Sequence, residues 1–259
     1  MFSPFQKNNC IPSKYSMKNK FFNYRFIVAY KASSYPFLYS KISQLLSGRN
    51  CYTNKHTDIV IDGFPRCGNT YATYAFDLAQ PKKLNIANHI HKRSQFLIAH
   101  KYGIPSILLI RNPVDCISST LVRQPKYDPE ALFQGYYFLY NGLKGLNSYV
   151  LGDFENVLNN YDKIIEAVNE KFGTDFSRYE KTEENEAKVK DIIHTQDELI
   201  GAKDYKQRVA YPTQERQKMN AEMKKLLFEK RYQYVRQKCM DIYDEMICIR
   251  MPKTYLQNN

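Results

Sequence analysis

Two glycines and a threonine at fixed spacing indicate phosphate chemistry. Gly63 and Gly68 are five residues apart, and Thr70 follows two residues later. This is the frame of the phosphate-binding loop G-x-x-x-x-G-K-[ST], in which backbone N–H groups and a helix N-terminus face an anion. Asn69 stands where that loop has lysine, and Arg66 offers a permanent cation from inside the loop instead. The pattern predicts a site for a phosphate-like anion rather than for Mg-ATP.

A second candidate anion-binding segment begins at the end of an apolar run. The run 106–110 is continuously apolar after its first serine, which is typical of a strand buried on both faces. Asn112 and Pro113 then form the signature of a helix start. Arg111 lies between strand and helix, and Ser119 lies two turns into the helix. Because ligands of open parallel sheets bind at the carboxyl ends of strands, we expect Arg111 and Ser119 to clamp a second phosphate beside the first loop.

Two histidines are candidates for a general base. His89 and His91 occur in the segment Ala87-Asn-His-Ile-His91. If this segment ends a strand, the two side chains point to the same side, because side chains alternate along a strand. An imidazole that titrates near neutral pH suits the removal of a proton from a hydroxyl group. The spacing does not choose between the two histidines.

The elements that must position these residues alternate between strands and helices. This order predicts a three-layer α/β fold, with a parallel sheet flanked by helices, over residues 56–259. The expected strands are 58–62, 84–87, 106–110 and 148–151. The expected helices are 70–79, 95–102, 160–172, two that begin after Asn112 and Asp128, and most of 212–249.

The positive charge gathers at the amino-terminal end. The chain has 259 residues, with 38 Lys and Arg against 26 Asp and Glu, and a net charge of +12. Residues 1–57 contain nine of the basic residues and no acid, so the rest of the chain carries 29 against 26. We expect residues 1–55 to form a basic extension, partly helical or disordered, with a weak contact to a membrane surface as one use. The body has no basic stripe with interleaved aromatics, which argues against a nucleic-acid partner.

The cysteines and histidines predict neither a metal site nor a disulfide scaffold. None of the six cysteines lies two to four residues from another, and none of the five histidines pairs with a cysteine at ligand spacing. We interpret the cysteines as reduced thiols of a cytoplasmic protein. No apolar run approaches the roughly 20 residues of a membrane-spanning helix.

The two anion-binding segments in this order resemble the signatures of the PAPS-dependent sulfotransferases, where PAPS is 3′-phosphoadenylyl sulfate. The resemblance rests on G-F-P-R-C-G-N-T at 63–70 and R-N-P-V-D-C-I-S-S at 111–119, and it extends over about residues 56–180. It implies a P-loop NTPase-like fold and PAPS as co-substrate, without a metal. It also implies that the 5′-phosphosulfate is held by Arg66, Cys67, Gly68, Asn69 and Thr70. The residues implied at the 3′-phosphate are Arg111, Ser119 and, from a basic carboxy-terminal loop, Arg216.

The resemblance also implies catalytic roles and an acceptor. Arg66 replaces a lysine that is frequent in the family, so its expected role is electrostatic stabilisation of the transferring group. His89 or His91 occupies the region of the family's base. The acceptor would be a hydroxyl group of a small molecule, a glycan or a lipid. Its pocket is expected from an aromatic helix that carries Phe133, Tyr136, Tyr137 and Tyr140, although the same side chains could also form core.

Two other functions stay open at this stage. A P-loop kinase of a small molecule or nucleotide would use the same loop, but it requires lysine at the position of Asn69. A non-catalytic module that binds phosphorylated ligands would need no base, so the presence of His89 and His91 argues against this function.

Overall fold

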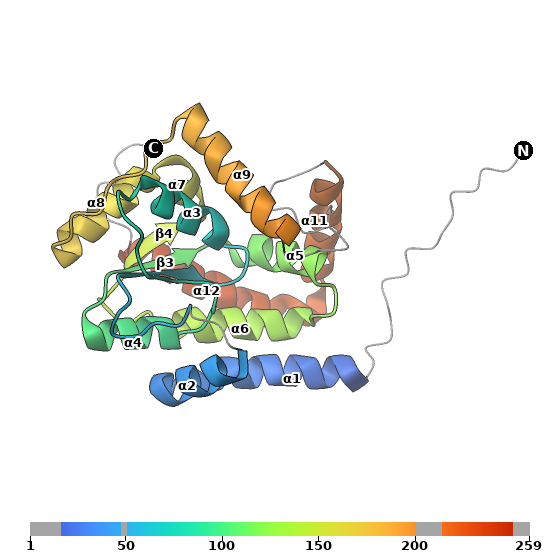
Figure 1. Cartoon of the computed structure of the whole chain (residues 1–259). Helices are drawn as coiled ribbons and strands as arrows, with labels where there is room; N and C mark the ends of the chain where they lie inside the picture. The colour runs from blue at the N-terminus through green and yellow to red at the C-terminus, as the bar shows by residue number, and fades with distance from the viewer. Residues whose placement is uncertain (1–16, 48–50, 200–213, 251–259) are drawn as a thin grey trace, which may run out of the picture.

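The computed structural model describes residues 17–47, 51–199 and 214–250, which form an α/β fold (Figure 1). Four parallel strands form one sheet in the order β2-β1-β3-β4. They are β1 (Ile59–Gly63), β2 (Ile86–Ala87), β3 (Ser106–Ile110) and β4 (Val150–Asp153). The two central strands, β1 and β3, are buried along their whole length, as their apolar sequences predict.

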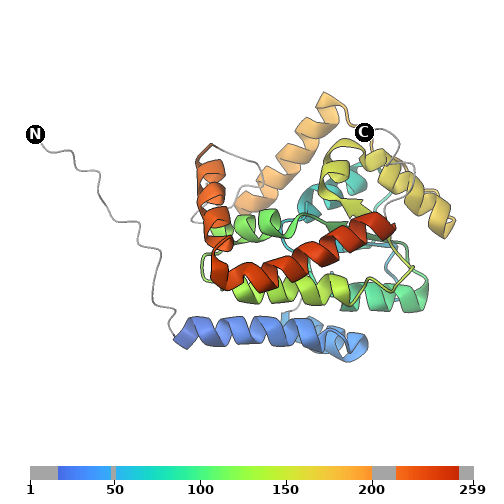
Figure 2. The same cartoon turned by 180° about the vertical axis from the view of Figure 1, so that it is seen from behind.

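Helices cover both faces of the sheet, so the expected α/β fold with a parallel sheet is confirmed (Figures 1 and 2). One face is covered by α3 (Asn69–Ala79), α7 (Phe154–Asn159) and α8 (Tyr161–Phe172). The other is covered by α4 (Ser94–Tyr102), α6 (Pro129–Asn141) and α12 (Gln233–Arg250). Further elements are α5 (Pro113–Arg123), α9 (Glu183–Leu199), which packs on α3, α11 (Gln214–Leu227), which packs on α5, and the short 3₁₀ helix η1 (Lys230–Tyr232).

Two amino-terminal helices add a layer outside α4 and α6. These are α1 (Met17–Ala32) and α2 (Pro36–Ser47), which lie below the rest of the molecule in Figure 1. The side chain of Tyr30 is buried, and its ring lies 6.2 Å from that of Phe64 at the end of β1. The division of the chain at residue 55 stays a prediction, but Tyr30 joins α1 to the core around the sheet.

The parallel arrangement brings the functional segments to one edge of the sheet. β1 is followed by the loop that contains Arg66, and β2 by the segment of His89. β3 is followed by Arg111, and β4 by Phe154. Ligands of open parallel sheets bind at this carboxyl edge. In the described part of the chain, no helix is both long and apolar enough to cross a membrane.

Candidate functional site

The loop after β1 needs glycine at both of its ends. A Cβ atom on Gly63 would lie 2.1 Å from the backbone oxygen of Leu109 on β3, so only glycine allows the two strands to approach this closely. Gly68 has a φ angle of 86°, in the left-handed region where glycine carries no steric penalty. Gly63 is therefore required by the close approach of β1 and β3, and Gly68 by its positive φ angle.

Buried polar groups hold the loop from beneath. The Asn69 side chain donates to the backbone oxygen of Phe64 at 2.9 Å. The hydroxyl of Tyr140 donates to the oxygen of Leu109 at 2.7 Å and accepts from the Phe64 N–H at 3.1 Å. Burial raises the pKa of Tyr140 well above its usual value, so this hydroxyl keeps its proton. The loop is thus fixed in shape before any ligand arrives.

The N-terminus of α3 leaves backbone donors available for an anion. The first bond within the helix runs from the N–H of Ala72 to the oxygen of Gly68 at 2.9 Å. The N–H groups of the preceding residues, Asn69 to Tyr71, therefore have no partner within the helix. Gly68 has no side chain to cap them. These donors and the partial positive charge of the helix end face the same side as the loop.

Arg66 and Arg111 bring two guanidinium groups to this helix end. The Nε of Arg66 donates to the Oγ of Ser119 at 3.0 Å, and an Nη atom of Arg111 donates to the backbone oxygen of Arg66 at 3.2 Å. Arg66 has a φ angle of 69°, a conformation that costs energy for any residue with a Cβ. The two anion-binding segments therefore meet, and they place two permanent positive charges beside one helix N-terminus.

Arg111 is positioned by aromatic residues from two other elements. The centre of its guanidinium lies 3.8 Å from the ring centroid of Phe154, which follows β4. Its backbone oxygen accepts a hydrogen bond of 2.9 Å from the hydroxyl of Tyr136 on α6. A planar guanidinium stacked on a ring is held in one orientation, which a lysine would not be.

His89 faces the first turn of α3. Its Nε2 atom lies 3.1 Å from the Oγ1 of Thr70, and its Nδ1 atom lies 2.8 Å from the Oδ1 of Asn88. Because a side-chain amide oxygen only accepts, Nδ1 carries the proton and Nε2 presents its lone pair to Thr70. This tautomer suits a base that acts at the N-terminus of α3.

His91 is bound to the end of β1 instead. Its Nδ1 atom lies 2.7 Å from the backbone oxygen of Gly63 and 3.0 Å from the Oδ1 of Asp62. Burial raises the pKa of Asp62, but the charge and hydrogen bonds of His91 outweigh this and leave the pKa below its usual value. Asp62 also accepts the backbone N–H groups of Ile90 and His91.

The two histidines follow a strand but do not belong to it, so the alternation of side chains along a strand does not apply to them. β2 consists of Ile86 and Ala87 only, and both His89 and His91 have φ angles in the left-handed region, 56° and 57°. The two N–H bonds to the buried carboxylate of Asp62 draw this segment into a turn. In the described part of the chain, Arg66 and these two histidines are the only non-glycine residues with positive φ. Strained backbone of this kind concentrates at functional sites.

A lysine lies directly behind the histidines. Lys92 is buried, and its Nζ atom lies 3.6 Å from the ring centroid of Tyr30 on α1. Burial lowers the pKa of Lys92 to about 7, against a smaller opposing effect of Asp62. Lys92 thus connects the carboxyl edge of the sheet with the amino-terminal layer.

Several side chains expected at the site are buried in the core. The side chain of Cys67 is fully buried, with its Sγ 3.6 Å from the hydroxyl of Tyr140, and its backbone N–H bonds to the oxygen of Phe64. On the aromatic helix, Phe133, Tyr136 and Tyr140 are fully buried and form core, and only Tyr137 is partly exposed. These three side chains therefore do not line an acceptor pocket.

Arg216 lies in the first turn of α11, which packs against α5, the helix of Ser119. Its side chain is outside the described residues. Its role at the 3′-phosphate stays a prediction.

Sequence reasoning missed three residues that shape the site. Asp62 is the last residue but one of β1, and a carboxylate at such a buried position is itself a signal of a bound cation or histidine. The residue types of Asn88 and Phe154 do not predict a functional role, because their roles depend on the neighbours that the fold brings to them. Among the described residues, no group of three or more His, Cys, Asp or Glu could hold a metal ion.

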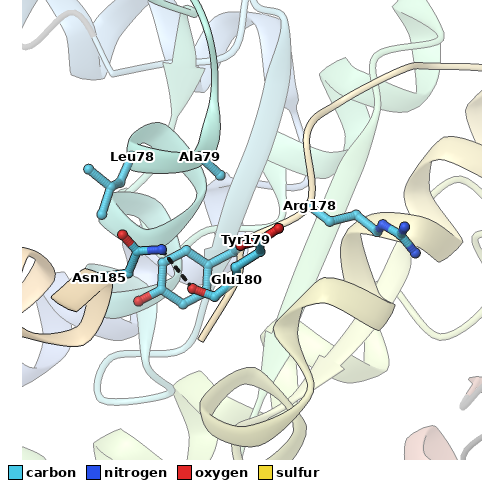
Figure 3. A pocket seen from close by; sticks show the side chains of 6 residues that line it. All are labelled: Leu78, Ala79, Arg178, Tyr179, Glu180 and Asn185. Carbon is cyan, nitrogen blue, oxygen red and sulfur yellow. Dashed lines mark hydrogen bonds between the residues drawn. The ribbon is translucent and has the colours of Figure 1, made fainter. Parts of the chain in front are cut away.

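One pocket lies away from this site, at the carboxyl end of α3 (Figure 3). It has a volume of about 250 Å³, and its lining includes Leu78, Tyr179 and Asn185. Arg178 extends away from the other lining residues in Figure 3, and it pairs with Glu166 at 3.0 Å. The pocket is therefore at the opposite end of α3 from Gly68 and is no part of the anion site.

No model of a protein family and no curated protein matches this chain. Among solved structures, the chain is similar to the crystal structure of mouse sulfotransferase SULT7A1 complexed with PAP. The two chains are 12% identical, and the alignment covers 76% of this chain and 92% of that chain with a TM-score of 0.39. At this TM-score the likeness carries no information on ligand or activity.

Proposed function

We propose that this protein transfers a sulfuryl group from PAPS to a hydroxyl acceptor. The observation that supports the proposal most is the meeting of Arg66, Arg111 and Ser119 at the N-terminus of α3. The donors at this point are two guanidinium groups, hydroxyls and backbone N–H groups, a set that fits phosphate and sulfate oxygens. The resemblance of the two sequence segments supports PAPS as the ligand that carries these anionic groups.

Arg66 and the first turn of α3 would bind the 5′-phosphosulfate. Arg111, stacked on Phe154, would bind the 3′-phosphate together with Ser119. The Ser119 hydroxyl, which accepts from Arg66 in the free protein, would then turn its proton towards the phosphate. The acceptor oxygen forms a bond to sulfur while the bond from sulfur to the leaving phosphate breaks, and Arg66 stabilises the negative charge that develops there.

His89 is the better candidate for the base. Its Nε2 atom is directed to Thr70 in the first turn of α3, whereas the Nδ1 of His91 is committed to Asp62 and Gly63. When Thr70 turns its hydroxyl to the bound anion, the Nε2 of His89 becomes available to take the acceptor's proton. His91 then acts as a positioning residue, because it fixes the turn that carries His89.

The geometry favours this reaction over the two alternatives. A kinase needs a lysine at the position of Asn69, whose amide here is turned inward to Phe64. A module that only binds phosphorylated ligands has no need of a histidine in the tautomer of His89.

The proposed acceptor is a hydroxyl group of a small molecule, a glycan or a lipid. The proposed location is the cytoplasm, and this proposal rests on the cysteine pattern of the sequence.

The test is incubation with sulfur-labelled PAPS and a panel of alcohols, phenols, sugars and lipid headgroups. We expect label to appear on at least one acceptor, with release of an equal amount of the product PAP. The matched control is His194→Ala, on the exposed part of α9, which should keep full activity while His89→Ala loses it. Transfer of phosphate from ATP but no transfer from PAPS would contradict the proposal.

A further inference from the structure

The amino-terminal layer presents an apolar stripe to solvent. On α2, Leu38, Ile42 and Leu45 are spaced by four and three residues, so they share one face of the helix, and Leu45 is 86% exposed. On α1, Tyr24 and Val28 are exposed in the same way. Single exposed apolar residues are ordinary, but three on one face of α2, with two more exposed on α1 in the same layer, mark an interaction surface.

The charge around this stripe has one sign. Residues 17–47 contain no acidic residue, and Arg25, Lys31 and Lys41 are exposed on the two helices. α4, which packs beside α2, adds His100 and Lys101 and no acid. The acids close to this layer, Asp128 and Glu130, lie at the start of α6, where the N–H of Asp128 donates to Asn23.

The stripe belongs to a fixed platform. A Cβ on Gly135 of α6 would lie 2.7 Å from the ring of Phe26, so α1 lies directly against α6. Arg93 donates to the backbone oxygen of Lys31 and to the side chain of Ser34 at the junction of α1 and α2. The outward faces of both helices therefore form the outer side of one layer, seen at the bottom of Figure 1.

From this arrangement we propose that the outer face of α1 and α2 docks on an anionic lipid surface. The aliphatic side chains of α2 enter the boundary between headgroups and acyl chains, and Tyr24 lies at the headgroup level. The lysine and arginine side chains pair with lipid phosphates and carboxylates. A second copy of the chain is a poorer occupant, because it would place two acid-free basic faces against each other.

The test uses the full chain and vesicles of phosphatidylcholine with and without phosphatidylserine, followed by flotation. We expect binding to the serine-containing vesicles that weakens when salt is raised, since electrostatic attraction is screened. The triple variant Leu38→Ser, Ile42→Ser, Leu45→Ser keeps every charge, including those of residues 1–16, and should bind at least about tenfold more weakly. Phe228→Ser, which removes an exposed aromatic residue elsewhere, is the matched control and should bind like the parent.

Three results would overturn the proposal. The first is equal binding of the parent and the triple variant while circular dichroism shows both folded, because the stripe would then have no part. The second is equal binding to vesicles with and without phosphatidylserine, which would remove the role of charge. The third is a concentration-dependent dimer in light scattering that the triple variant abolishes, because the stripe would then be covered by a second copy.

Discussion

The Nε atom of Arg66 lies 3.0 Å from the Oγ atom of Ser119, so two residues 53 positions apart in the sequence form one contact. Arg66 comes from the loop after β1 and Ser119 from the helix after β3. The contact joins the two anion-binding segments before any ligand is present. Under the proposed function, we therefore expect the binding of the two phosphates of PAP to be interdependent.

The interdependence predicts a non-additive pair of variants. Arg66→Ala should weaken PAP binding by about 1.5–3 kcal/mol, the range for a bond to a charged group, and Ser119→Ala by about 0.5–1.5 kcal/mol. Because the two side chains touch, the double variant should depart from the sum by about 0.5–3 kcal/mol. Calorimetric titration of the parent, the two single variants and the double variant with PAP measures this departure from additivity. Strict additivity would mean that the two side chains contribute to PAP binding independently.

Arg111 should not be replaceable by lysine. Its planar group stacks on Phe154 and bonds to the backbone of Arg66, and a lysine offers neither a plane nor a fork of donors. Arg111→Lys and Arg111→Ala should both weaken PAP binding by about 1.5–3 kcal/mol. The loss should be smaller for ADP, which lacks the 3′-phosphate. An equal loss for PAP and ADP would assign Arg111 to the 5′ side.

The two histidines should differ in what they affect. His89→Ala should reduce turnover by about 10²–10⁴-fold and leave PAP affinity near its parent value. His91→Ala should chiefly lower the free energy of unfolding, by about 3–5 kcal/mol, because it removes the imidazole that pairs with the buried carboxylate of Asp62. Turnover and urea denaturation of both variants check this. The reverse pattern would make His91 the base.

The paired Asp62 should make the protein sensitive to acid. Its pKa is lowered in the folded state, so its contribution to stability is present above the ordinary carboxyl pKa and disappears as the pH falls through the folded value. Asp62→Asn should therefore lower stability at neutral pH and flatten the stability curve between about pH 5 and 2. Urea denaturation across that range measures the slope. An unchanged slope would mean that another group causes the acid transition.

Burial of Lys92 should lower the free energy of unfolding at neutral pH. Its pKa is about 7 in the folded protein against 10.5 normally, so the unfolded chain binds more protons between these values and stability should rise with pH across that window. Lys92→Met should raise the free energy of unfolding near pH 6 by about 1–4 kcal/mol, the range for replacing a buried charge by an apolar residue. The same variant should also remove the rise of the free energy of unfolding with pH. A less stable variant at every pH would show that the contact with Tyr30 outweighs the cost of burial.

The sequence predicted the elements well where local signals were strong. The apolar run 106–110 is β3 without a shift, and the N-caps Asn112 and Asp128 begin α5 and α6. The weaker strand expected at 148–151 is displaced to Val150–Asp153, because pairing with β3 fixes its register. Strand patterns that depend on a neighbour cannot be located from their own residues.

The sequence predicted that two of the segments would lie close together, and their roles in binding stay predictions. Arg66, Arg111 and Ser119 meet as their positions after parallel strands implied. The turn of the two histidines could not be foreseen, because it depends on the carboxylate of Asp62 from another strand. The aromatic side chains of α6 were ambiguous for a related reason, since burial and ligand binding use the same residue types.

Calorimetric titration without magnesium tests most directly whether one site binds both phosphates of PAP. We expect PAP to bind at least about tenfold more tightly than ADP, since a charge-assisted bond to the 3′-phosphate contributes about 1.5–3 kcal/mol. ATP should bind no better than ADP, because Asn69 replaces the lysine that would reach the terminal phosphate. Equal affinities for PAP and ADP, or tight binding of ATP that requires magnesium, would contradict the account.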